Sequence, residues 1–377
     1  MFEDHFQRID KPMSIHEFYP LLAPIMAEIG CGHANLWPPD GYWDSAPDRM
    51  FPVQIHFSQD EKIWVLHTFG IDPGIPPGSE IISINKQPAG EIIQTLLLDQ
   101  SADGYNRSLK LWKLNNRFQN LFALHYGFPS EYEIGYLYQG KKKKIILPPI
   151  QRETIRDHFK PEHDSTWFDN HLKFEILEDY NTALIKLKTF AYYSENKKFK
   201  SFIDQSFKEI RDNSIQNLIL DLRDNDGGDP FCSVHVLAYI EPEPIPYFSR
   251  PYGKYSHMAK PIPMAKHPYT GELFILIDGG GLSTTGHFTS VLKYNHVGTF
   301  IGLETGGTYT CNNASKMINL DHTQYYVNCP RATFATAVSG FPPDRGIMPD
   351  IEVEPSVEDI INGKDTMMEI ALAKIKE

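Results

Sequence analysis

Apolar positions recur with two different periods along the chain, and each period predicts a different kind of element. In SIHEFYPLLAPIMAEIG, residues 14–30, apolar side chains follow helical spacing after Ser14, and Glu17 completes a capping-box pattern. The predicted helix stops at Gly30, so His33 follows just beyond its carboxyl end. From Phe51 to about Pro149, short alternating or apolar runs predict mostly strands, with one helix at roughly 107–125.

Within that strand-rich region, the two runs EYEIGYLY and KKIILPP predict a hairpin that turns at the lysines Lys141–Lys144. A run of four lysines is a solvated shoulder of such a hairpin far more often than a phosphate site. The stretch IPPGSEIISINKQPAGEII predicts one compact unit of turn, short strand, Asn85-Lys86 turn and helix.

A different pattern begins near Leu172. KFEILEDYNTALIKLKTF predicts a hairpin, and an amphipathic helix follows, with Phe199, Phe202, Ile203 and Ile210 on one face. Two buried strands, NLILDLR and ELFILID, are each followed by a glycine-containing turn and a helix, and GTFIGLE is a further strand. This alternation predicts an α/β unit with a largely parallel sheet, whose turns NDGGD and GGGLS lie at the carboxyl ends of strands, where sites are favoured.

Length and composition limit the possible classes. The 377 residues predict more than one structural unit: a helical segment at 1–50, a mostly β module at 51–150 and an α/β core at 151–377. A net charge of −12 argues against nucleic acid or an anionic membrane as a general partner. No segment has the length of apolar residues that a membrane span needs, and MFEDHFQRIDKPMS lacks the features of a signal peptide.

Four cysteines are too few for a disulfide scaffold and form no CxxC pair. Cys311 and Cys329 could face each other across a hairpin, but two free thiols are an equal alternative. The histidines show no metal-ligand spacing such as HExxH, and no phosphate loop or dinucleotide pattern occurs. We therefore expect no cofactor and no metal.

Ser283, in DGGGLSTTGHFTS, raises the main question of function. Serine is among the best N-cap residues, so the stretch alone favours a helix cap. The same position also suits a nucleophile, since the unpaired N–H groups and the dipole of the helix would stabilise an oxyanion. The turn at Gly227 and Gly228 can bring backbone N–H groups close to a ligand.

LILDLRDNDGGDPF and LIDGGGLSTTGHFTSVLKYNHVGTFIGLETGG resemble two signature segments of the C-terminal-processing peptidases and of their tricorn-core and interphotoreceptor-retinoid-binding relatives. GCGH, after the first helix, and the terminal GIMPDIEVEP match as well. The resemblance implies a crotonase-like α/β spiral as the peptidase core, an N-terminal helical segment and a PDZ-like module between them. IPPGSEIISINKQPAGEII is similar to a PDZ stretch, with Asn85-Lys86 in place of the usual Asn-Gly.

The resemblance also implies roles for individual residues. One branch of the family uses a lysine base, but Thr308 stands at that position here. The tricorn-like branch takes its base from a histidine that maps onto His33. The resemblance thus implies Ser283 as nucleophile, His33 as general base, Asp344 as the acidic group that orients the base, and the N–H groups of Thr284 and of Gly227 or Gly228 as oxyanion donors. Asp350 is interpreted as a structural turn residue.

Three positions depart from the family pattern. Gly286 stands where the family has a glutamate, Gly32 stands where tricorn-type proteins have a serine, and His287 is interpreted as a packed or solvent-facing histidine.

These observations leave two candidate functions. The first is a serine peptidase that cleaves peptides or unfolded protein tails; the second is a catalytically weak or inactive member that binds peptides or hydrophobic ligands. By analogy with relatives, we expect a bacterial protein that is exported, with its signal removed before Met1.

Overall fold

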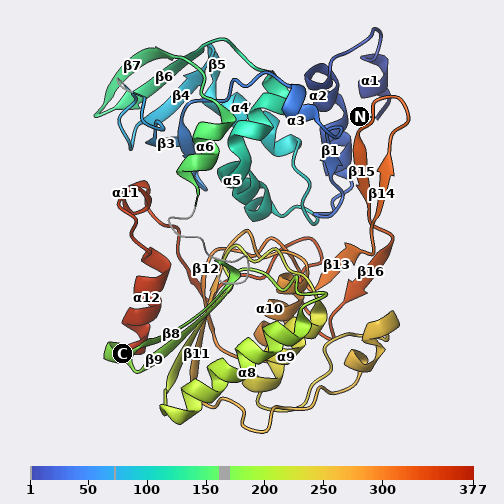
Figure 1. Cartoon of the computed structure of the whole chain (residues 1–377), viewed down its shortest axis with the longest axis vertical. Helices are drawn as coiled ribbons and strands as arrows, with labels where there is room; N and C mark the ends of the chain where they lie inside the picture. The colour runs from blue at the N-terminus through green and yellow to red at the C-terminus, as the bar shows by residue number, and fades with distance from the viewer. Residues whose placement is uncertain (1, 72–73, 161–169) are drawn as a thin grey trace.

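The computed structural model describes residues 2–71, 74–160 and 170–377. Its elements form two halves, with an N-terminal half above and an α/β half below in the view of Figure 1. The N-terminal half contains α1 (Phe2–Gln7), α2 (Ile15–Glu28), β1 (Leu36–Trp37), α3 (Tyr42–Ser45), β2 (Gln54–Phe57), β3 (Ile63–His67), β4 (Glu80–Ile84), β5 (Gln87–Pro88), α4 (Ala89–Leu98), α5 (Arg107–Tyr126), β6 (Tyr132–Tyr138), β7 (Lys141–Leu147) and α6 (Arg152–His158).

Helix α2 forms because its sequence supplies both a start signal and an apolar face. The predicted capping box is confirmed: the Glu17 carboxylate accepts a hydrogen bond from the Ser14 backbone N–H at 2.8 Å. Gly30 follows the helix in the left-handed conformation, with φ of 64°, which glycine adopts without steric cost. The chain then turns back toward the middle of the molecule and brings His33 with it.

The main sheet of the N-terminal half has the order β2-β3-β4-β6-β7, with β5 beside β4. Helices α4 and α5 pack against the apolar face of this sheet through a cluster that includes Phe51, Phe118 and Tyr132. The hairpin of β6 and β7 is confirmed, but the turn is at Gln139 and Gly140, and the four lysines form the exposed start of β7. Both turn residues have positive φ, which suits a tight hairpin. A PDZ-like identity for this module stays a prediction.

The α/β half contains β8 (Leu172–Leu177), β9 (Thr182–Leu187), α8 (Asn196–Asp212), β10 (Asn217–Asp221), α9 (Pro230–Ile240), β11 (Glu272–Ile277), α10 (Thr284–Tyr294), β12 (Thr299–Gly302), β13 (Thr310–Asn313), β14 (Lys316–Asn319), β15 (Tyr326–Cys329), β16 (Ala332–Ala335), β17 (Ile351–Glu352), α11 (Val357–Ile361) and α12 (Thr366–Ile375), with short 3₁₀ turns at η1 (Glu178–Tyr180) and η2 (Gly253–Ala259). Its main sheet has the order β17-β12-β11-β10-β9-β8, and only the β8–β9 pair is antiparallel. The predicted α/β fold with a largely parallel sheet is confirmed.

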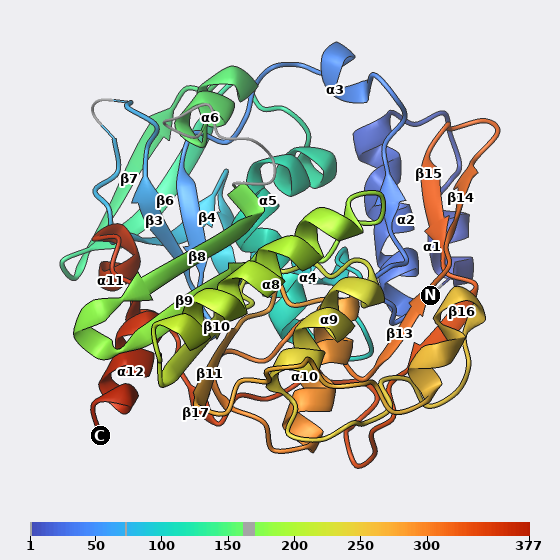
Figure 2. The ribbon, with the colours of Figure 1, turned by 60° about the horizontal axis from the view of Figure 1, so that its bottom comes forward.

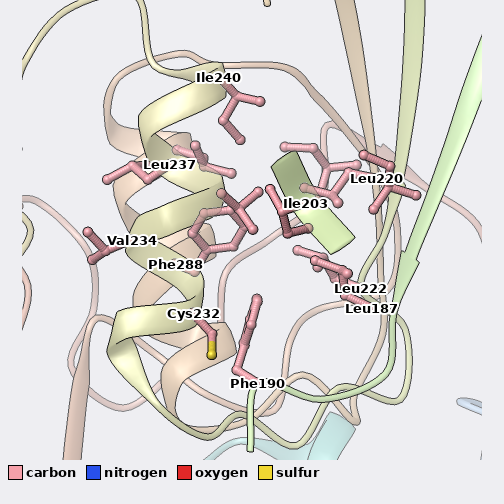
Figure 3. Packing of buried hydrophobic residues seen from close by; sticks show 14 of the residues in the cluster. Leu187, Phe190, Ile203, Leu220, Leu222, Cys232, Val234, Leu237, Ile240 and Phe288 are labelled. Carbon is pink, nitrogen blue, oxygen red and sulfur yellow. The ribbon is translucent and has the colours of Figure 1, made fainter. Parts of the chain in front are cut away.

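Helices cover both faces of this sheet, which explains why its strands are continuous apolar runs. Figure 2 shows α8, α9 and α10 on one side and α12 on the other. Figure 3 shows Phe288 of α10, Leu237 of α9 and Ile203 of α8 packed toward Leu220 of the sheet, and all four are almost fully buried. Burying each such side chain contributes about 1.5–3 kcal/mol, so this layer holds the strand ends and their turns in fixed positions.

The two halves meet along the carboxyl ends of these strands. Among the contacts, the Asn106 side-chain amide donates to the Thr305 carbonyl at 2.7 Å, and the Trp112 indole donates to Asp224 at 2.9 Å. In addition, the hairpin of β14 and β15 reaches up beside the N-terminal helices, where β15 pairs with β1 through Leu36 and Val327 (Figure 1). In the described part of the chain, no helix is both long and apolar enough to span a bilayer.

Candidate active site

Ser283 lies between the end of β11 and the start of α10, at the position of the N-cap. Its side chain makes no capping hydrogen bond, and its backbone has φ of 59° and ψ of −121°. Such a conformation is unfavourable for any residue except glycine, and residues held in this way gather at active sites. The Ser283 hydroxyl instead contacts the Cys311 thiol at 3.6 Å. The serine therefore occupies the cap position without acting as a cap.

Two backbone N–H groups beside Ser283 form a candidate oxyanion hole. The Gly227 N–H donates to the Asn225 side chain at 3.0 Å, whereas the N–H groups of Gly228 and Thr284 have no acceptor within the described ranges. The Thr284 hydroxyl donates to the Gly228 carbonyl at 2.6 Å and so ties the two turns together. Of the two glycines that the sequence left open, Gly228 is the one with an available donor.

Both glycines are needed for this close approach. A Cβ on Gly227 would lie 2.7 Å from the Ser283 Cβ, and one on Gly228 would lie 2.2 Å from the backbone of Ala191. Their φ values, 96° and 139°, also belong to the region that side chains disfavour. The NDGGD turn is thus built to press its backbone against the serine.

His33 reaches the same place from the N-terminal half. Its backbone carbonyl accepts a hydrogen bond from the Asn328 side chain at 2.7 Å, which fixes the segment against β15. Burial, reinforced by the nearby Lys113 ammonium, lowers the pKa of His33 to about 4. At neutral pH the imidazole is therefore uncharged, which is the form that a general base requires.

Cys311, on β13, connects the two groups. Its thiol lies 3.8 Å from Nδ1 and 4.0 Å from Nε2 of His33, in addition to its contact with Ser283. Burial raises the pKa of this thiol, so it stays protonated at neutral pH. Cys311 lies opposite Phe334 in the β13–β16 pair, and Cys329 lies opposite Lys316 in the β14–β15 pair of another sheet, so the two cysteines do not face each other, and both are free thiols.

A carboxylate that the sequence did not single out lies beside the histidine. Asp103 places a carboxylate oxygen within 4.8 Å of a ring nitrogen of His33, and its Oδ1 accepts the Gly32 N–H at 2.7 Å. Burial raises the pKa of Asp103 to about 6, against the opposing effects of the Gly32 N–H and Lys113. No local sequence motif identifies Asp103 as a site residue, because it stands 70 positions after His33 and only the fold brings the two side chains together.

Asp344, which the family resemblance implied as the orienting acid, lies elsewhere along the interface. Its backbone carbonyl accepts a hydrogen bond from the Tyr105 N–H at 3.0 Å. The Glu304 carboxylate and, to a smaller extent, the Asp344 carboxylate raise the pKa of the neighbouring Arg345. Across the residues that the structure describes, Asp344 has no hydrogen bond to His33. Asp350 accepts from the Phe300 N–H at 2.9 Å and pairs with Lys293, in keeping with a structural role.

The departures from the family pattern have physical reasons. A Cβ on Gly286 would lie 2.6 Å from the backbone carbonyl carbon of Gly307, so the close packing of α10 leaves no room for a glutamate. A Cβ on Gly32 would meet Leu109 and Leu282 side chains at 3.2 and 3.1 Å. His287 is buried beside Phe248, with ring centroids 5.8 Å apart. Burial lowers its pKa to about 3, which agrees with a packed histidine.

Two hollows open beside Ser283. One is a cleft of about 580 Å³ between the halves, lined by both His33 and Ser283 and by charged groups of both signs, including Lys113, Arg117 and Asp226. The other is a cavity of about 230 Å³. Its walls include the aromatic residues Tyr193, Phe248, Tyr255 and Phe334, together with His287, Cys311 and Asn313. The 241–268 loop contributes Phe248 and Tyr255 to this cavity, and the TYTCNNASK segment contributes Cys311 and Asn313.

Comparisons with known proteins agree with the fold. Residues 181–353 match the family described as peptidase family S41. Mature CPAF in complex with lactacystin has a similar fold, with a TM-score of 0.66 at 12% identity over 99% of this chain and 90% of that one. Mature CPAF alone gives 0.65, again at 12% identity, over 99% and 89% of the two chains. The search of curated proteins found no match.

The α/β half thus has the fold and the sequence features of a peptidase. Residues 181–353, the central part of this half, carry the match to peptidase family S41. The expected family is confirmed, and family membership supports a hydrolase that acts on peptide or protein substrates. The roles of the individual site residues stay predictions.

Proposed function

We propose that the chain is a serine peptidase in which Ser283 is the nucleophile and His33 the general base. One observation carries the proposal: a serine in a strained turn, free of any capping bond, stands beside two available N–H donors, of Gly228 and Thr284. A helix cap needs neither the strain nor the donors, whereas acyl transfer uses both.

In the proposed mechanism, the Ser283 hydroxyl attacks the peptide carbonyl carbon and passes its proton to His33. The carbonyl oxygen becomes an oxyanion that accepts hydrogen bonds from Gly228 and Thr284. His33 then protonates the leaving amine, and water hydrolyses the acyl-enzyme by the same steps in reverse order. Cys311 lies in contact with both groups, so the His33 ring must turn past this thiol to reach the hydroxyl, a tightening that substrate binding commonly brings about.

Asp103 replaces Asp344 in this proposal as the group that orients the base. One of its carboxylate oxygens lies within 4.8 Å of a ring nitrogen of His33, and its Oδ2 has no hydrogen-bond partner in the described structure. The proposed substrate is a peptide or an unfolded protein segment that crosses the cleft. Export of the chain belongs to the proposal as well and rests on the family resemblance alone.

The second candidate function is peptide binding without catalysis, and the Cys311 thiol between Ser283 and His33 favours it. Labelling with a fluorophosphonate probe separates the two functions, because the probe reacts only with an activated serine. The wild-type chain should be labelled on the peptide that contains Ser283, and Ser283→Ala should remove the label. Ser290→Ala is the matched control, since Ser290 lies on the same helix with its hydroxyl bonded to the His287 carbonyl.

Absence of labelling in the wild type, with an active serine hydrolase labelled in parallel, would refute the catalytic proposal and leave peptide binding. Labelling that persists in Ser283→Ala would refute the choice of nucleophile.

The aromatic cavity beside Ser283 predicts which substrates are cleaved. We expect an apolar side chain on the residue that donates the scissile carbonyl, because a charged one would lose its hydration among Phe248, Tyr255 and Phe334. Phe334→Lys should raise kcat/KM for an acidic residue relative to an apolar one by about 10–100-fold. Paired peptide substrates measure this ratio. Phe341→Lys, which changes an aromatic residue outside the cavity walls, should leave the ratio unchanged, and an equal shift in both variants would contradict the assignment.

A further inference from the structure

Three side chains of different chemistry converge next to the proposed base. Cys31, His33 and Asp103 each offer one ligand atom, and these atoms all lie within 4.8 Å of one another. Cys31 and Asp103 are more than nine-tenths buried, while His33 lines the cleft of about 580 Å³ and leaves the cluster open to a small solute. The peptidase mechanism proposed above makes no use of Cys31.

One of these groups, the Asp103 carboxylate, has an oxygen without a hydrogen-bond partner in the described structure. This oxygen, Oδ2, is buried. The Cys31 thiol donates a long hydrogen bond of 3.9 Å to the Asn312 carbonyl. A buried carboxylate oxygen without a partner is costly, and a bound cation removes that cost.

The donor set selects the kind of cation. Thiolate, imidazole and carboxylate together are typical ligands of Zn²⁺, whereas Mg²⁺ and Ca²⁺ take oxygen ligands alone. In a tetrahedral zinc site the ligand atoms lie about 3.4–3.6 Å apart, as follows from metal–ligand distances of roughly 2.0–2.3 Å. Side-chain movements of about 1 Å would bring the cluster to that geometry.

We propose that Cys31, His33 and Asp103 bind Zn²⁺ reversibly and that the bound ion switches the peptidase off. The Cys31 thiol releases its proton to solvent on binding, His33 binds through a neutral ring nitrogen, and Asp103 binds as a carboxylate. The Cys311 thiol, 3.8 Å from Nδ1 of His33, is available for the fourth position, where it would also release its proton, and water is the alternative ligand.

The inhibitory part of this inference rests on the proposed role of His33 as the base. A ring nitrogen that coordinates zinc, or a ring turned to do so, cannot take the proton of Ser283. The binding part does not depend on catalysis, so the two parts are measured separately.

Binding is tested on the full chain, freed of metal with a chelator, by titration of Zn²⁺ in competition with a chromophoric chelator. We expect one ion per chain, and Cys31→Ala should weaken binding more than about 100-fold, since even outer-shell partners of zinc ligands contribute 10–100-fold. Cys329→Ala is the matched control, because this thiol lies on β15 outside the cluster. Co²⁺ in place of Zn²⁺ should give a thiolate charge-transfer band that is weaker in Cys31→Ala and Cys31→Ser than in the wild type.

Inhibition is tested as the ratio of activity with and without stoichiometric Zn²⁺, so that each variant serves as its own reference. The ratio of activity with Zn²⁺ to activity without it should be about one tenth or less in the wild type and in Cys329→Ala, and close to one in Cys31→Ala. Binding at no fixed stoichiometry, or binding that Cys31→Ala leaves intact, would overturn the site. Stoichiometric binding of Zn²⁺ with unchanged activity would overturn the inhibitory role but not the binding site. If the fluorophosphonate probe does not label the chain, the catalytic proposal is refuted, and the zinc titration still decides whether the binding site exists.

Discussion

Ser283→Gly should abolish peptidase activity and, at the same time, make the fold more stable. Loss of the nucleophile lowers kcat by about 10⁶-fold in serine peptidases that have been measured this way. The gain in stability comes from the backbone, because Ser283 has φ of 59° and ψ of −121°, a conformation open to glycine. Relief of such strain is worth about 1–3 kcal/mol, and the greater freedom of glycine in the unfolded chain takes back about 0.5–1 kcal/mol.

Ser283→Ala is the matched control for this effect, since alanine removes the hydroxyl but keeps the Cβ. Denaturant unfolding should give Ser283→Gly a free energy of unfolding about 1 kcal/mol above that of Ser283→Ala, with both variants equally inactive on peptides. Equal stability of the two variants would mean that the turn at Ser283 is not strained, and the main structural reason for regarding this serine as a nucleophile would be lost.

Asp103→Asn should lower kcat by about 10²–10⁴-fold, as expected when the acid that orients a histidine base is replaced by its amide. The amide still presents an oxygen to the Gly32 N–H, so the fold is preserved while the negative charge beside His33 is lost. Asp344→Asn should change kcat by no more than a few-fold, because Asp344 makes its contacts with Tyr105 and Arg345. The opposite ranking would restore Asp344 as the orienting acid.

The pH profile separates an orienting role of Asp103 from a merely structural one. Burial raises the pKa of Asp103 to about 6, so its carboxylate is charged only above that pH. Burial lowers the pKa of His33 to about 4, so the ring is already neutral there. In the wild type, kcat/KM should therefore rise as the pH increases through about 6, whereas the residual activity of Asp103→Asn should rise through about 4. An unchanged profile would contradict the assignment.

The sequence predicted the parts of this site that lie on local patterns. Ser283 and Gly228 follow buried parallel strands, and the carboxyl ends of neighbouring strands meet at one edge of a sheet, so their proximity could be foreseen. His33 could be found only through the order of motifs along the chain. Asp103 and Cys311 could not be found, because each is close to His33 only by virtue of tertiary packing, and neither stands in a recognisable pattern.

Gly286 shows a second reason why the sequence alone does not predict the role of every residue. As a departure from the family pattern it suggested a loss of function, yet the fold gives a reason of packing, since α10 lies against the backbone of Gly307. The lysines Lys141–Lys144 illustrate the same limit in the N-terminal half, where composition suggested a turn and the pairing of β6 with β7 placed them on a strand. In both places, long-range contacts decide what a residue does.

The hairpin of β14 and β15 links the segment that carries His33 to the α/β half of the molecule. Although His33 stands some 250 positions before Ser283, its carbonyl is held by Asn328, and the adjoining β1 is a strand of the hairpin's own sheet. The proposed base is therefore anchored by the same half of the molecule that carries the proposed nucleophile. A fragment that began after β1 would keep the family-matching segment and lose its base, while a fragment that ended before β14 would keep His33 without its support. The proposed active site therefore depends on segments from both halves of the chain.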